Sequence, residues 1–320
     1  MRIPSLLRGS VLWFVLSCLV PAALAAAEAP VDRTLTGDKV CTRCHDESEA
    51  KPVLSIYQTP HGVKADGRTP GCQSCHGASE AHVKNAAGAE TRPAVDVLFG
   101  KGADAARVSA ACVSCHQGGA RMHWPGSAHQ TRDVTCTNCH KVHAAHDDVR
   151  DRKTQAEVCY TCHAAQRAQS HRISAHPLKD GKMACSDCHN PHGSIGPKLL
   201  IKATVNETCY TCHADRRGPF LWEHQPVTDD CSNCHTPHGS NNAPLLKARE
   251  PWLCQECHSA NHARTVYSGQ NLPGSAQITL NGAQDPGKQA PTAQLNGRSC
   301  SACHAKVHGS NHPAGAKFNR

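Results

Sequence analysis

The chain has 320 residues, of which 4% are aromatic, and its mean hydropathy is −0.49. A chain this polar, with 24 Gly and 20 Pro, buries too little of its own apolar surface to offset the entropy lost on folding. The composition therefore excludes an ordinary apolar core, and something other than side chains must fill the interior. The formal net charge of +8 at pH 7 would on its own favour an acidic partner such as nucleic acid.

The first residues are typical of a secretory signal peptide. Arg2 and Arg8 supply positive charge, and the apolar stretch near them is too short to span a bilayer. An alanine-rich run then allows cleavage after Ala25 or Ala27. We expect residues 1–25 to be removed on export to the periplasm, and we expect no later transmembrane helix.

Ten copies of Cys-x-x-Cys-His follow, and they contain every cysteine except Cys18 of the leader. In chain order, the cysteines of motifs 1 to 10 are Cys41 and Cys44, Cys72 and Cys75, Cys112 and Cys115, Cys136 and Cys139, Cys159 and Cys162, Cys185 and Cys188, Cys209 and Cys212, Cys231 and Cys234, Cys254 and Cys257, and Cys300 and Cys303. The motif histidines are His45, His76, His116, His140, His163, His189, His213, His235, His258 and His304.

This motif is the attachment sequence of c-type haem. Two cysteines three residues apart lie on one face of a helical turn, within reach of both porphyrin vinyl groups, and the histidine on that face can bind the iron. Zinc sites or disulfides do not need a histidine at the next position. With 24 histidines in 320 residues, ten matches in ten copies are not chance, and we predict ten covalent haems.

Haem also explains the missing core, because a sparse polypeptide can wrap flat, apolar porphyrins as small domains wrap a metal. We expect the chain without haem to be unfolded. Two propionates on each haem reverse the basic balance of the polypeptide and leave the holoprotein negative, and with export to the periplasm this excludes a nucleic-acid partner.

The second axial ligand of each iron is expected to be histidine, because the chain has only three methionines. The candidates upstream of each second motif are His61, His129, His176 and His224. The candidates downstream of it are His82, His143, His192, His238 and His308. The tenth candidate is His262, with His312 in reserve, and His123, His146 and His171 are expected at the surface or bonded to propionates.

Motif spacing predicts that residues 26–320 form one cytochrome domain. The domain divides into five dihaem units, each with a first and a second motif: unit 1 (41–111), unit 2 (112–158), unit 3 (159–208), unit 4 (209–253) and unit 5 (254–320). We expect a haem-cored repeat array that is elongated, mostly coil with short α-helices, and has little or no β-sheet. The segment 264–299 is expected to be a loop.

Chain length limits how the histidines can pair. Three residues span at most about 10 Å, which is less than the distance between the Cα atoms of two histidines on opposite faces of one haem. His192 therefore cannot bind the far side of the haem held by His189. His143 and His238 are excluded from their own haems in the same way, and all three must bind a neighbouring haem. The upstream histidines lie eleven to sixteen residues past the first motif. We expect them to loop back to that motif.

Two further sequences carry a family resemblance. Pro191-His192-Gly193-Ser194 recurs at 237–240, and the chain ends in Cys300-Ser-Ala-Cys303-His304-Ala-Lys-Val-His308-Gly-Ser-Asn-His312-Pro. With ten motifs, the chain resembles the DmsE/MtrA family of periplasmic decahaem cytochromes. The resemblance implies a bis-histidine haem wire seated in an outer-membrane β-barrel partner. It would pass electrons between inner-membrane or periplasmic cytochromes and extracellular iron, another metal or a cytochrome.

Two other functions compete with the conduit. A freely diffusing periplasmic carrier that donates to a terminal reductase would need no barrel. An enzyme would need a haem with an open axial position, often marked by an altered motif such as Cys-x-x-Cys-Lys, which does not occur here. We therefore expect no catalytic residues, although an exposed haem could still exchange electrons directly with dissolved iron. The direction of electron flow is open.

Overall fold

The computed structural model describes residues 36–48, 53–63, 65–85, 91–258, 279–280, 283–284, 299–313 and 315–319. All of them belong to one compact unit, Thr34–Arg320. The predicted signal peptide, the candidate ligand His262 and most of the predicted loop at 264–299 lie outside the described residues.

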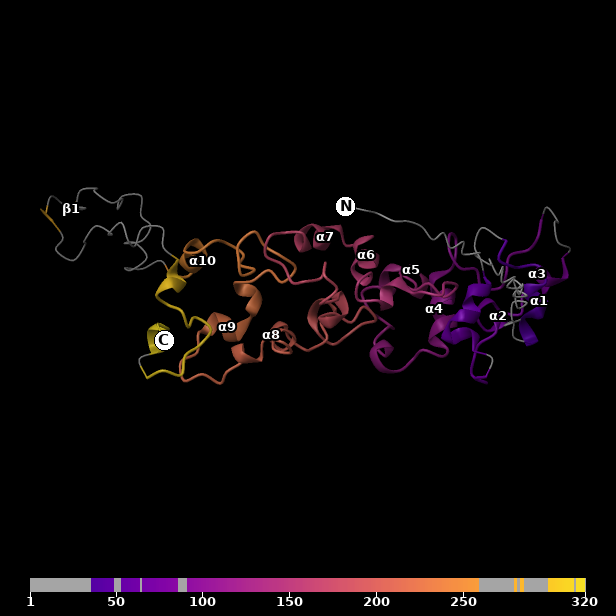
Figure 1. The fold of residues 1–320 in the computed structure, drawn as a ribbon, viewed down its shortest axis with the longest axis horizontal. Helices are drawn as coiled ribbons and strands as arrows, with labels where there is room; N and C mark the ends of the chain where they lie inside the picture. The colour runs from indigo at the N-terminus through magenta and orange to yellow at the C-terminus, as the bar shows by residue number, and fades with distance from the viewer. Residues whose placement is uncertain are drawn as a thin grey trace, which may run out of the picture. The chain divides into compact units, whose positions relative to one another are not determined.

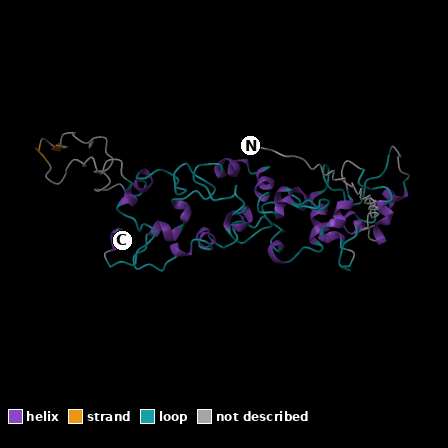
Figure 2. Cartoon of the chain, viewed as in Figure 1, coloured by secondary structure: helices purple, strands orange, loops and turns teal. Residues whose placement is uncertain are grey.

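The described residues form short helices joined by loops (Figures 1 and 2). The α-helices are α1 (Lys39–Thr42), α2 (Cys72–His76), α3 (Glu80–Lys84), α4 (Ala105–Val113), α5 (Cys136–Cys139), α6 (Gln155–Tyr160), α7 (Ala164–Ser170), α8 (Val205–Cys209), α9 (Gln225–Asp229) and α10 (Trp252–Gln255). The 3-10 helices span Thr36–Asp38, Leu54–Gln58, Pro60–Gly62, Gly119–Arg121, Gln130–Arg132, Asp148–Arg150, Cys185–Asp187, Pro197–Leu199, Ala214–Arg216, Cys231–Asn233, Cys300–Ala302 and Gly315–Lys317.

Strand structure is minimal in the part of the chain that the structure describes. Strands β1 (Thr279–Leu280) and β2 (Ala283–Gln284) pair antiparallel, with Thr279 opposite Gln284 and Leu280 opposite Ala283. The other pairings are isolated bridges, such as Ser174 with Ser240. The predicted fold class, a mostly coil chain with short helices and hardly any sheet, is confirmed.

Each Cys-x-x-Cys-His motif closes one helical turn. The backbone N–H of the histidine donates to the carbonyl of the first cysteine, for example from His116 to Cys112 at 2.9 Å and from His163 to Cys159 at 3.0 Å. This bond keeps the first cysteine and the histidine on one face of the turn, as the attachment chemistry requires. First motifs come at the end of a helix, as Cys209 ends α8, whereas second motifs begin one.

Side-chain caps start several of the helices that carry first motifs. The carboxylate of Asp104 accepts from the backbone N–H groups of Ala106 and Arg107 at the start of α4, at 2.9 and 3.1 Å. The hydroxyl of Thr204 accepts from the N–H of Glu207 at the start of α8, at 3.1 Å. Such caps stabilise helices too short to persist on propensity alone.

Consecutive units dock through the loop that follows each second motif. Ser240 of unit 4 bridges to Ser174 of unit 3, and Ser310 of unit 5 bridges to Trp222 of unit 4. The glycine before each of these serines has a positive φ, +144° at Gly239 and +138° at Gly309. A side chain at Gly239 would overlap the carbonyl oxygen of Gln169 in unit 3. The glycine therefore allows the backbones of two units to approach closely.

Few apolar side chains are buried by protein. Among the described residues, the apolar ones almost inaccessible to solvent are Tyr57, Val108, Trp124, Ala156, Tyr160, Ala184, Leu246 and Pro251. They are spread over the units instead of forming one contiguous core.

Candidate haem-binding sites

The structure brings nine of the ten motif histidines face to face with a histidine from outside the motifs. The nine pairs of described residues are His45–His82, His61–His116, His76–His143, His129–His163, His140–His192, His176–His213, His189–His238, His224–His258 and His235–His308. The ring centroids of each pair are 5.9 to 6.3 Å apart.

This spacing fits one iron between two imidazoles. A metal–imidazole nitrogen bond is about 2 Å long and the ring centroid lies about 1 Å behind the nitrogen, so two rings on opposite sides of a metal have centroids about 6 Å apart. The centroid distance stays nearly constant while the angle between the rings runs from 9° in His140–His192 to 80° in His61–His116, as expected for two rings that share a metal. The paired imidazole rings and the motif cysteines beside them together fit a c-type haem, with two axial histidines and two thioether bonds.

Hydrogen bonds fix the orientation of many of these rings through Nδ1. His129 donates to the carbonyl of Pro191 and His176 to that of Pro237, each at 2.8 Å. Other such contacts from Nδ1 are His76 to Val97, His82 to Pro93, His143 to Val53, His189 to Lys198, His224 to Val307, His235 to Pro244 and His304 to Lys317. His140 bonds instead to the carboxylate of Asp147 at 2.7 Å. A donor at Nδ1 leaves the Nε2 lone pair available to a metal.

Burial keeps several of the paired rings neutral. It lowers the pKa of His76, although the bond to the Val97 carbonyl opposes the change, and it lowers the pKa of His238 and His308. Neighbouring imidazoles of the same pairs act in the same direction. The neutral form is the one that can bind iron, so protein packing and metal binding favour the same protonation state.

The downstream histidines pair as the limit on chain length requires. His143, His192 and His238 do not face the motif histidine three residues before them. Each faces the second-motif histidine of the preceding unit, as His192 faces His140. His308 of unit 5 follows the same rule with His235 of unit 4.

The prediction for the upstream histidines is wrong. His61, His129, His176 and His224 do not loop back to the first motif of their own unit, and each faces the first-motif histidine of the next unit. The reason lies in the docking loops. The Nδ1 of His129 bonds to the carbonyl of Pro191, and that of His176 to Pro237, directly before the downstream histidine of the next unit. Chain length allowed both pairings, and this contact selects one.

The two motifs of a unit touch through their first cysteines. The thiols of Cys112 and Cys136 lie within hydrogen-bonding distance, and this contact raises the pKa of Cys112. Equivalent contacts join Cys41 to Cys72, Cys159 to Cys185, Cys209 to Cys231 and Cys254 to Cys300. The attachment points of two haems are thus adjacent in each of the five units.

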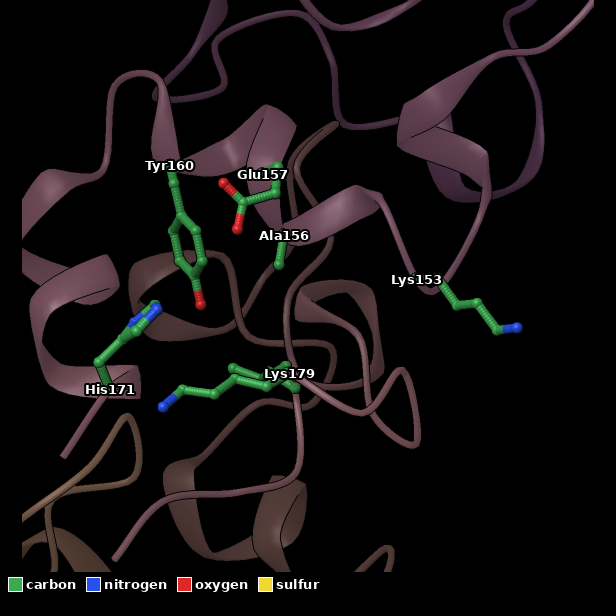
Figure 3. Close-up of a pocket in the computed structure, with 7 residues that line it drawn as sticks. Lys153, Ala156, Glu157, Tyr160, His171 and Lys179 are labelled. Atoms are coloured by element: carbon green, nitrogen blue, oxygen red, sulfur yellow. The ribbon is translucent and has the colours of Figure 1, made fainter. Parts of the chain in front are cut away.

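His146 and His171, which belong to none of the pairs, lie on the surface. His146 is exposed, with Nε2 3.6 Å from Asp148 and 3.7 Å from Asp151. His171 borders a pocket with Tyr160 and Lys179, and its Nδ1 lies 2.8 Å from the carbonyl of Arg167 (Figure 3). These two positions agree with the expectation of surface histidines.

Sequence reasoning missed the carbonyl groups that orient the rings. Proline supplies the carbonyl at Pro93, Pro191, Pro237 and Pro244. The repeated Pro-His pair at 191–192 and 237–238 was visible in the sequence, but nothing in it shows that the proline carbonyl bonds to a histidine of another unit.

The chain is similar to known multihaem cytochromes. The chain is 40% identical to the multiheme cytochrome MtrA of Shewanella baltica (strain OS185), over 95% of this chain and 92% of that protein. The chain belongs to the MtrA family. The doubled CXXCH motif model matches residues 176–218 and 224–263, and the model for NrfB-like cytochrome c-type proteins matches residues 72–155.

Membership of the MtrA family establishes the chemistry at a coarse level. The protein is a multihaem c-type cytochrome whose Cys-x-x-Cys-His motifs hold covalent haem, and its role is electron transfer. Across the residues that the structure describes, no helix is both long and apolar enough to cross a membrane.

Proposed function

We propose that this protein is a periplasmic wire of ten bis-histidine haems that conducts electrons across the outer membrane, inside a β-barrel partner. The observation that carries the wire is the exchange of histidines between units. Every neighbouring pair of units trades two of them, as His129 of unit 2 faces His163 of unit 3 while His192 of unit 3 faces His140 of unit 2.

This exchange links the haems of the second motifs into a series. His140 would hold the haem of motif 4, and His143, three residues later, faces His76 of motif 2. His189 and His192 relate motifs 6 and 4 in the same way, as do His235 and His238 for motifs 8 and 6. Short segments of chain therefore connect neighbouring irons of this series. The haems of the first motifs form a second series. There, a longer segment runs from each first motif to the upstream histidine of the same unit, which faces the first-motif histidine of the next unit, as His129 faces His163.

Contacts between first cysteines would connect the two series within each unit. The arrangement is a ladder: ligand-bearing segments form its two sides, and cysteine pairs such as Cys159–Cys185 form its rungs. Electrons entering at either end would then meet haems at every unit. This connectivity supports the division of residues 26–320 into five dihaem units.

The ends of the ladder need ligands from their own unit. In unit 1 the downstream histidine, His82, faces His45 of the same unit. By the same pattern, the upstream histidine of unit 5 would bind the haem of His304 in its own unit. His262 holds that position in the sequence, four residues after His258. We therefore assign His262, in preference to His312, as the tenth distal ligand.

Three parts of the proposal are supported only by membership of the MtrA family. They are the β-barrel partner, the location at the outer membrane and the terminal electron donors and acceptors. Electrons would come from or go to inner-membrane or periplasmic cytochromes on one side, and extracellular iron, another metal or a cytochrome on the other. Outer-sphere exchange with iron needs no open axial position. The same ladder serves oxidation or reduction, since direction follows the potentials of the partners.

Two measurements on the exported protein test the proposal. The intact mass should correspond to a chain cleaved near Ala25 with ten haems added. In membrane fractions solubilised with mild detergent, a tagged chain should purify together with an outer-membrane β-barrel. Complete recovery in the soluble periplasmic fraction would instead support the diffusing carrier, and fewer than ten haems would contradict the wire itself.

A further inference from the structure

The five second-motif histidines bond through Nδ1 to the chain that follows each motif. Four of them bond to a backbone carbonyl, namely His76 to Val97, His189 to Lys198, His235 to Pro244 and His304 to Lys317. In unit 2 the acceptor is a side chain instead, because Nδ1 of His140 lies 2.7 Å from Oδ2 of Asp147. Motif 4 therefore differs from the other second motifs in the charge of the group bonded to its iron ligand.

A short loop returns Asp147 to the motif. Helix α5 (Cys136–Cys139) ends at His140, whose backbone is extended, with φ −92° and ψ 137°. Asp147 lies seven residues after His140, whereas the carbonyl acceptors of units 3 and 4 lie nine residues after their histidines. In this shorter loop a carboxylate, and not a backbone carbonyl, meets the ring.

Both oxygens of Asp147 are engaged. Oδ2 accepts from His140, and Oδ1 accepts from the backbone N–H of Lys141 at 3.1 Å. The side chain of Asp147 is 19% exposed and that of His140 is 34% exposed, so solvent screens their contact only in part. In the described part of the chain, the lysines and arginines that form ion pairs do so with other acidic residues. The negative charge of Asp147 is therefore not neutralised by a salt bridge.

The distal ring of this pair brings no second acceptor. His192 faces His140 with ring centroids 6.1 Å apart, and Trp124 packs edge-on against His192 at 6.5 Å. Nδ1 of His192 is buried and has no hydrogen-bond partner among the described residues. Any electron donation that a hydrogen bond adds to this pair of ligands thus comes from Asp147.

A carboxylate at Nδ1 makes an imidazole a stronger electron donor. A hydrogen bond from the ring to a carboxylate is about twice as strong as one to a neutral carbonyl. It draws the Nδ1 proton toward oxygen, and the other ring nitrogen becomes more basic toward a metal. Such a ligand, with a negative charge beside it, stabilises Fe(III) relative to Fe(II), because reduction removes one positive charge from the iron.

We propose that Asp147 is a positioning residue that lowers the reduction potential of the haem at motif 4, so that this haem is the last of the second-motif series to be reduced. The inference rests on the haem proposed for that motif. Each electron taken up converts one Fe(III) to Fe(II) and comes from an electrode or from a reduced neighbouring haem, which is oxidised in turn. In a partly reduced ladder, electrons would cross unit 2 on the first-motif side, through the haem held by His116.

An amide in place of the carboxylate separates charge from geometry. The amide oxygen of Asp147→Asn can still accept from His140, so this variant should fold and load haem. In a spectroelectrochemical titration, the ferrous-to-ferric ratio of one haem should rise about tenfold at a fixed potential, which corresponds to about 59 mV for a one-electron couple. Asp147→Glu keeps the charge and should restore at least part of the lower potential.

The neighbouring Asp148 provides a matched control. Its exposed carboxylate lies 3.6 Å from Nε2 of His146, which belongs to none of the pairs. Asp148→Asn therefore removes the same charge one residue further along and should leave the titration unchanged. A shift as large as that of Asp147→Asn would mean that any nearby charge has this effect, and it would overturn the proposal.

Removal of the acceptor distinguishes tuning of the potential from a purely structural role. Asp147→Ala should shift the same step at least as far as Asp147→Asn, and it supplies the measurement if the amide variant loads fewer haems. With ten haems present, an unaltered titration in Asp147→Asn would overturn the proposal, and so would loss of a haem in both variants. Haem content of the unaltered protein is measured in parallel, and a shortfall there would contradict the wire and not the role of Asp147.

Discussion

At the scale of single residues, the two ring nitrogens of each paired histidine have different roles. Nδ1 bonds to a backbone carbonyl, as His176 does to Pro237, while Nε2 is left for iron. The nine pairs keep nearly one spacing although their interplanar angles run from 9° to 80°. A shared metal explains this, because it fixes the distance along its axis and leaves rotation about it free.

Replacing His262 should expose one iron. We expect His262→Ala to add a high-spin ferric component of about one haem in ten to the electronic and EPR spectra, since removal of a sixth ligand leaves an open position. His312→Ala is the control and should leave all haems low-spin. The opposite result, high-spin haem in His312→Ala alone, would assign the tenth ligand to His312.

At the scale of elements, the Pro-His-Gly-Ser loop performs three tasks in four residues. In unit 4 the carbonyl of Pro237 orients His176 of unit 3, and His238 faces His189 of unit 3. Gly239 then lets the chain pass close to Gln169, and Ser240 completes the bridge to Ser174. One loop thus couples ligand binding to docking between units.

A methyl group at Gly239 should disrupt this docking. Gly239→Ala combines a positive φ, which costs about 1–2 kcal/mol for a residue with a side chain, with overlap against the backbone of Gln169. Gly100→Ala is the matched control, because Gly100 also has a positive φ, +102°, but no atom within 4 Å of the new methyl. We expect the thermal midpoint to fall several degrees further for Gly239→Ala. Equal losses in both variants would mean that the close approach contributes nothing.

At the scale of the whole molecule, the described residues form no contiguous apolar core. The buried apolar side chains of the described residues are few and scattered, from Tyr57 in unit 1 to Leu246 in unit 4. The units are joined instead by shared ligand pairs. Loss of a haem held between two units would therefore affect both units, and stability should follow haem content more closely than side-chain packing.

The chain without haem should be unfolded. Expressed in a host that lacks haem attachment to cytochrome c, the mature chain should have a far-UV circular dichroism spectrum of coil and no cooperative thermal transition, because its apolar burial is too small to offset chain entropy. The holoprotein at the same concentration is the control. A cooperative transition in the haem-free chain would show that polypeptide packing suffices.

The cofactor could be predicted from the sequence, and so could the attachment residues and the candidate distal ligands, because covalent attachment demands a fixed local spacing that one helical turn satisfies. It also excluded the pairing of His192 with the haem of His189, since three residues cannot reach around a porphyrin. Only the tertiary structure decided where His61, His129, His176 and His224 go. A chain of eleven to sixteen residues reaches backward or forward equally well, and the choice is made by contacts between units that no local pattern encodes.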